Sequence, residues 1–119
     1  MGKKILVIDD NEQELMILKR TLTKAGYEDL VFADGAEEGI EKAKTAKPDL
    51  IIADINMPKK SGVEVHNILK QIPDMKNIPI IFHSSLIQSG EQPGGGLNQV
   101  FPKTHSSEDL IRKIKELIG

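Results

Sequence analysis

Residues Pro48–Pro58 read PDLIIADINMP, and the fold can be inferred outward from this stretch. Its apolar run, flanked by proline, lacks the alternation of a strand with one wet face, so it predicts a strand buried on both faces of a parallel sheet. The run ends on Asp54, and an ionised side chain has no structural use inside such a strand. Ligands bind at the C-terminal edge of open α/β sheets. Asp54 is therefore either an ordinary solvent-facing carboxylate or part of a site at that edge.

Apolar runs and helical periodicity alternate along the rest of the chain. Four further strands are predicted, at Lys3–Asp9, Asp29–Ala33, Ile78–Ser84 and Gln99–Phe101. Helical spacing follows a cap at Asp10 or Asn11, a capping box at Asp34, another at Ser61, and a cap at Ser106 or Ser107. Five strands alternating with helices imply right-handed crossovers. The expected class is α/β, a doubly wound parallel sheet with helices on both faces.

The segment between the fourth and fifth strands departs from this regularity. Leu86–Gln92 has enough helical character for two turns, but Pro93 and the three glycines after it cannot continue a helix. We therefore expect the fourth helix to be shortened or irregular.

Composition narrows the class of protein. A chain of 119 residues fits a single domain, 1–119, and no apolar stretch approaches the roughly 18 residues of a membrane span. The absence of cysteine and of a signal-peptide pattern predicts a cytoplasmic protein. A formal net charge of -2 and few aromatic residues disfavour direct nucleic-acid binding. We expect neither a membrane nor a nucleic acid as a direct partner.

Polar residues follow the predicted strands at the edge where parallel strands end together. They are Asp9, Asp10, Asp54, Ser84 and Lys103. Three neighbouring carboxylates repel one another, so a cation is needed, and an oxygen-only ligand set favours Mg²⁺. Mg²⁺ and Lys103 would together balance the three acids, leaving the site able to accept a phosphoryl dianion. These are the parts for phosphoryl transfer onto a carboxylate, with Asp54 as the nucleophile.

Several of these motifs together resemble one known family. The sequence ILVIDD at Ile5–Asp10, Asp54, Met57–Pro58 with Gly62, Ser84 and Lys103 follow in the order found in response-regulator receiver domains of two-component signalling. The resemblance covers nearly all of the chain. It implies a flavodoxin-like five-stranded sheet of order 2-1-3-4-5.

The resemblance also implies a role for each residue of the site. Asp54 is the phospho-acceptor, Lys103 contacts the phosphate, and Ser84 is the switch hydroxyl. Metal ligands would be Asp10, Asp54, the backbone carbonyl of Asn56, and Asp9 through water. The implied function is Mg²⁺-dependent acceptance of a phosphoryl group from a histidine kinase or a histidine phosphotransfer domain, followed by switching of an unknown downstream partner. A receiver is a signalling module rather than a metabolic enzyme.

Two positions depart from the receiver pattern. Val100 stands where the family usually has an aromatic switch residue, and Thr104 where it commonly has a proline after the lysine. Because a cis bond before a non-proline residue costs about 2.5–4 kcal/mol, we expect a trans Lys103–Thr104 bond. These departures keep open a pseudo-receiver that only docks proteins. An aspartyl-phosphate hydrolase of the haloacid-dehalogenase type is disfavoured because its nucleophile belongs on the first strand.

The remaining polar residues have simpler interpretations. His66 is expected to face solvent, and His83 to pack beneath a helix. The charged residues of the second and the last helix are typical of ordinary polar faces.

Overall fold

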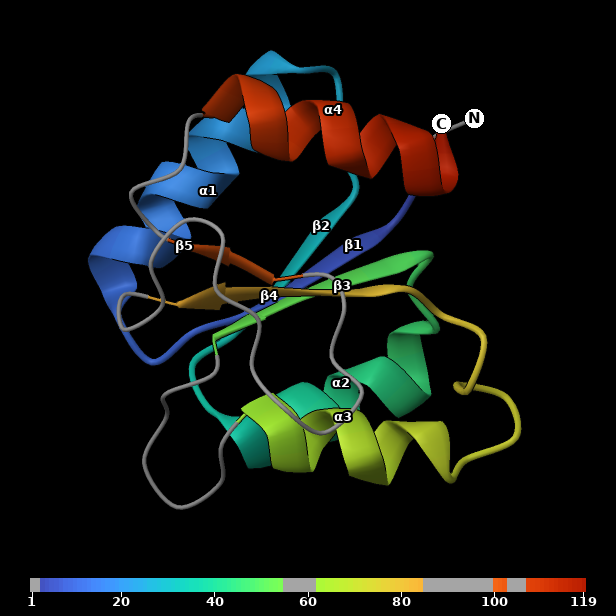
Figure 1. The fold of residues 1–119 in the computed structure, drawn as a ribbon. Coiled ribbons are helices and arrows are strands. Elements are labelled where there is room, and N and C mark those ends of the chain that lie inside the picture. The colour runs from blue at the N-terminus through green and yellow to red at the C-terminus, as the bar shows by residue number, and fades with distance from the viewer. Residues whose placement is uncertain (1–2, 55–61, 85–99, 103–106) are drawn as a thin grey trace.

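The computed structural model describes residues 3–54, 62–84, 100–102 and 107–119, and these form a parallel sheet between two helical layers (Figure 1). The strands are β1 (Ile5–Ile8), β2 (Leu30–Ala33), β3 (Leu50–Asp54), β4 (Ile80–Ser84) and β5 (Val100–Pro102). The helices are α1 (Glu12–Lys24), α2 (Ala36–Ala46), α3 (Gly62–Lys70) and α4 (Ser107–Ile118). The sheet order β2-β1-β3-β4-β5 confirms the predicted fold. The expected irregular helix at Leu86–Gln92 lies outside the described residues. The label α4 therefore denotes the C-terminal helix, Ser107–Ile118.

Alternate residues of β1, β2, β3 and β4 supply two separate cores. Ile8 and Ile51 join residues of α2 and α3, whereas Val7 and Ile52 join residues of α1 and α4. We call these sides the α2–α3 face and the α1–α4 face; Figure 1 shows one pair of helices on each side of the sheet. All four residues of β1 are buried, as are all five of β3. Burial on both faces accounts for the uninterrupted apolar runs Ile5–Ile8 and Leu50–Ala53.

Helix α1 begins at one of the two caps that its sequence predicts. The side chain of Asn11 caps it by accepting hydrogen bonds from the backbone N–H groups of Gln13 and Glu14. After Lys24 the chain turns at Gly26, which has a φ of 101°. Glycine adopts this left-handed conformation without a steric penalty, so it ends the helix.

The predicted capping box at Asp34 is wrong. Helix α2 starts one residue later than expected, with Gly35 as N-cap and no side chain bonding the first turn. The shift brings Glu38, rather than Glu37, to the third helical position. There its Oε1 accepts a hydrogen bond of 3.1 Å from the backbone N–H of Asp34.

One glycine inside α2 sets how closely that helix approaches the sheet. A Cβ built on Gly39 would lie 2.5 Å from Cδ1 and 2.8 Å from Cγ1 of Ile8 on β1. No carbon atom fits at such distances, so the backbone of α2 occupies space that a side chain would need. The α2–α3 face is therefore tightly packed beside β1.

Helix α3 ends at Lys70. The backbone N–H of Ile72 bonds the carbonyl of Leu69, an i to i−3 bond that tightens the chain into a turn before Pro73. Lys70 supports the following connection, because its Nζ donates to the carbonyls of Lys76 and Ile78 at 2.9 and 3.0 Å. Partial burial lowers the pKa of Lys70 below its usual value.

The sequence predicted the environments of His66 and His83 with different success. His66 is partly buried rather than solvent-facing, because its ring packs on Phe82 with centroids 5.7 Å apart. His83 is buried, as expected.

No helix in the described part of the chain combines the length and apolar character needed to cross a bilayer.

Candidate functional site

Three carboxylates meet at the C-terminal edge of the sheet. Asp9 and Asp10 follow β1, and Asp54 is the last residue of the neighbouring β3. Each of these side chains offers one oxygen, and the three oxygens lie within 4.8 Å of one another. The clustering of these three acids, predicted from the strand ends, is therefore confirmed. We call this group the acidic cluster.

Asp9 is fixed by the turn that joins β1 to α1. Its side chain is 1% exposed, and Oδ1 accepts a 2.9 Å hydrogen bond from the backbone N–H of Asn11. The backbone N–H of Asp9 donates to the carbonyl of Ala33, at the end of β2. Because Asn11 also caps α1, one short turn orients the acid and begins the helix. The positive end of the α1 dipole, at this N-terminus, favours negative charge nearby.

Asp54 is held on the central strand of the sheet. It is 4% exposed, and β3 pairs with β1 on one side and β4 on the other. Its register partner on β4 is His83, which is also buried. Removing carboxylates from water costs several kcal/mol unless charge or hydrogen bonds compensate. Two such acids beside exposed Asp10 form a strongly electronegative site.

The donor set fits a small divalent cation. All three donors are carboxylate oxygens, the hard ligands that Mg²⁺ prefers. Mg²⁺ binds oxygen at about 2.0–2.1 Å, so ligands across its octahedron lie about 4.2 Å apart. Ligands at neighbouring positions lie only about 3 Å apart. Three oxygens within 4.8 Å of one another could therefore share such an ion if they moved closer together, or if one of them bound it through a water molecule. An ionised carboxylate beside that ion is suited to nucleophilic attack on phosphorus.

The other predicted site residues lie at or beyond the limits of the described chain. Ser84 ends β4 in register with Pro102 of β5, and the placement of its side chain is not described. Asn56 and Lys103 are outside the described residues, as is the predicted trans bond between Lys103 and Thr104. Lys103 follows β5 in the sequence.

Comparison with known proteins points to one family. The sequence model of the response regulator receiver domain matches residues 5–115. The alkaline phosphatase synthesis transcriptional regulatory protein PhoP of Bacillus subtilis is 34% identical over 99% of the chain, which spans only 49% of PhoP. The polar-differentiation response regulator DivK of Brucella anthropi is 30% identical over the whole chain and 98% of DivK.

A solved structure repeats the fold. The receiver domain of the sensor histidine kinase PA1611 from Pseudomonas aeruginosa superposes with a TM-score of 0.88, covering 100% of this chain and 99% of its own. The two sequences are 20% identical, so the likeness concerns the fold alone. That protein has a magnesium ion coordinated in its active site cleft.

Proposed function

Because the chain belongs to the response regulator receiver domain family, we propose that Asp54 accepts a phosphoryl group from a phosphohistidine donor. Receiver domains take phosphate from histidine kinases and act in signalling rather than as metabolic enzymes. The observation that carries the proposal is the acidic cluster, in which a buried carboxylate on the central strand lies beside two others. We take residues 1–119 as one receiver domain.

The proposed reaction moves one phosphoryl group between two proteins. A carboxylate oxygen of Asp54 attacks phosphorus, the N–P bond of phosphohistidine breaks, and an O–P bond forms. The released imidazole nitrogen keeps the electron pair and can take a proton from solvent. Later attack by water on phosphorus releases inorganic phosphate and restores the carboxylate. The acyl phosphate is therefore a reversible signal on Asp54.

Mg²⁺ is the proposed cofactor, supported by the oxygen donor set of this chain and by the magnesium ion of PA1611. Asp10, Asp54 and the backbone carbonyl of Asn56 would bind it directly, and Asp9 through water. Bound there, the ion would offset the negative charge of the acids and of the incoming phosphate. Asp9, held by Asn11, would keep a fixed orientation toward that ion.

Two further residues complete the proposed site. Lys103 would pair with phosphate oxygens, and Ser84 would donate its hydroxyl to the phosphoryl group and shift the surface near β4 and β5 between two packings. Support comes from the topology, because β4 and β5 both end at the edge that carries the acidic cluster.

Intact-mass measurement with acetyl phosphate and Mg²⁺ tests the proposal directly. The unmodified chain should gain one phosphoryl group, and Asp54→Asn should gain none. Asp74→Asn, which changes an exposed aspartate in the turns after α3, should be phosphorylated like the parent chain. Equal adduct on the Asp54→Asn variant would place the modification elsewhere and overturn the proposal.

A phosphorylation-independent docking module is the second candidate, and Val100 favours it. Val100 occupies β5 in register with Phe82, at the position where the resemblance leads one to expect an aromatic switch residue. If neither acetyl phosphate nor phosphoramidate forms an adduct in the presence of Mg²⁺, the docking module is the better description. Rapid turnover of assorted phosphate esters would instead indicate a hydrolase.

A further inference from the structure

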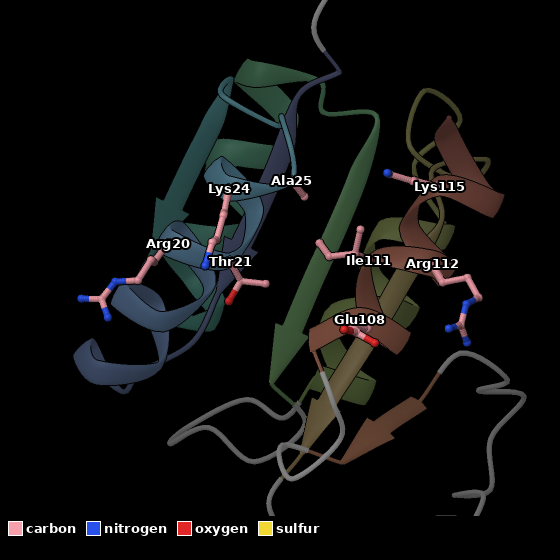
Figure 2. Close-up of a pocket in the computed structure, with 8 residues that line it drawn as sticks. All are labelled: Arg20, Thr21, Lys24, Ala25, Glu108, Ile111, Arg112 and Lys115. Carbon is pink, nitrogen blue, oxygen red and sulfur yellow. The ribbon is translucent and has the colours of Figure 1, made fainter.

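A groove lies between the C-terminal half of α1 and the length of α4, on the α1–α4 face (Figure 2). Its volume is about 670 Å³, within the range of sites that bind ligands in proteins. Both walls carry cationic side chains: Arg20 and Lys24 from α1, Arg112 and Lys115 from α4. We call this feature the basic groove. It contains none of the residues of the proposed phosphorylation site.

The groove concentrates positive charge in an acidic chain. Its four cationic residues outweigh its one acid, Glu108, giving the lining a net charge of +3. The whole chain carries -2, so everything outside the groove sums to -5. Such segregation attracts anionic partners and raises their association rate, more so at low salt. The charges are therefore arranged for a complementary, negatively charged surface.

The cations are spread along two walls and do not converge on one point. Figure 2 shows the side chains of Arg20 and Arg112 directed away from each other, outward from α1 and from α4, and Arg112 is also paired with Asp109 at 2.8 Å. Two arginines that diverge in this way cannot both bind the same phosphate ion. An extended ligand with several carboxylates matches the spacing better. Between the walls, Ile111 and Ala25 add half-buried apolar surface.

We propose that the basic groove docks an acidic segment of a partner protein, with an apolar residue of that segment seated on Ile111 and carboxylates facing the two walls. Glu108 repels carboxylates at its end of the groove, so the acidic end of the segment lies toward Lys24 and Lys115. Grooves between helices commonly hold peptide segments through such alternate anchors.

The position of the groove separates docking from phosphoryl transfer. Helix α1 begins beside the acidic cluster and ends at Lys24. Its 13 residues span about 20 Å at 1.5 Å per residue. A segment seated at the far end of α1 leaves the acidic cluster open to a phosphodonor. The same chain can then hold one partner while it exchanges phosphate with another.

A fluorescent peptide in which one leucine is flanked by several glutamates is the probe. The fluorescence anisotropy of the peptide is measured as the full chain is added, at low and at moderate salt. Charge reversal of two walls, Lys24→Glu with Lys115→Glu, should weaken binding by roughly tenfold or more, since attraction becomes repulsion. The matched control is Lys44→Glu with Lys76→Glu, which makes the same change in net charge at exposed positions outside the groove. The control should change the affinity less than twofold.

Three outcomes would overturn the inference: no binding at low salt, equal loss in the groove and control variants, or equally tight binding of a polythymidine strand in place of the peptide. Chemical-shift changes centred on Thr21 and Ile111 would support it, because both line the groove. Acetyl phosphate labelling of both double variants should match the parent chain. Labelling and docking therefore fail independently, and loss of one leaves the other proposal standing.

Discussion

The two faces of the sheet are built differently. On the α2–α3 face, Gly39 brings α2 so near β1 that no side-chain carbon would fit, and His66 of α3 packs on Phe82. On the α1–α4 face, the helices leave the basic groove between them. Both faces bury apolar side chains completely, so a dry core does not require closely packed helices. The difference suggests that one face contributes rigidity and the other contributes accessible surface.

The largest expected effect on stability comes from replacing one fully buried side chain on each face with alanine. Leu69→Ala on α3 and Ile114→Ala on α4 both remove fully buried side chains, and each should cost about 2–5 kcal/mol of unfolding free energy. We expect Leu69→Ala to cost more, because α4 can shift toward the groove and partly fill the space that Ile114 leaves. Urea unfolding at neutral pH measures both. A larger cost for Ile114→Ala would show that the α1–α4 face is the more rigid.

A substitution at the close approach gives a smaller effect. Gly39→Ala should destabilise the fold by about 1–2 kcal/mol, because crowding against Ile8 costs about 1–3 kcal/mol and better helix propensity returns up to about 1. The control is the same substitution with Ile8→Val, which deletes the nearest atom, Cδ1. The cost of Gly39→Ala should fall in that background when both are compared by urea unfolding. An unchanged cost would mean that the contact with Ile8 is not its source.

Tyr27 gives the smallest effect, on the α1–α4 face. Its hydroxyl is buried with no hydrogen-bond partner among the described residues, so Tyr27→Phe should leave stability at neutral pH unchanged or slightly higher. Burial raises the pKa of Tyr27 above 10.0. Above that pH the unfolded chain loses its proton first, so stability falls until the pH passes the folded pKa.

The chain has a single tyrosine, so ultraviolet titration of the tyrosinate band reports Tyr27 alone. We expect a midpoint above 10.0 in the folded chain, and no alkaline contribution from this position in Tyr27→Phe. A midpoint at or below 10.0 would show that the hydroxyl reaches water, which would make the α1–α4 face more open than its buried residues indicate.

The sequence predicted most of the sheet and the centre of the site. Buried parallel strands have uninterrupted apolar runs, which can be recognised in the sequence. Acids directly after two of these runs predicted the acidic cluster. Helix ends were harder, because Asp34 and Gly35 both suit an N-cap and only the path of the chain into α2 selects the glycine. The end of α3 depended on a tight turn and on contacts of Lys70 with carbonyls farther along the chain.

Features made by distant segments could not be predicted in the same way. Arg20 and Arg112 each look like ordinary members of a polar helix face, and only the placement of α1 beside α4 makes them walls of one groove. The exposure of His66 was predicted wrongly for a related reason. It depends on contact with Phe82, which lies on β4 and is distant in the sequence. Local pattern locates an element and its buried stripe, but it does not measure the space between two helices.

The central place of β3 has a consequence for how the molecule opens. Because β3 is hydrogen-bonded to strands on both sides, its amides are expected to exchange with solvent only in the rarest openings of the chain. The residue proposed to carry the signal thus belongs to the last part of the fold to come apart. Helices at the periphery can loosen, bind and release partners many times while the reactive carboxylate stays in register.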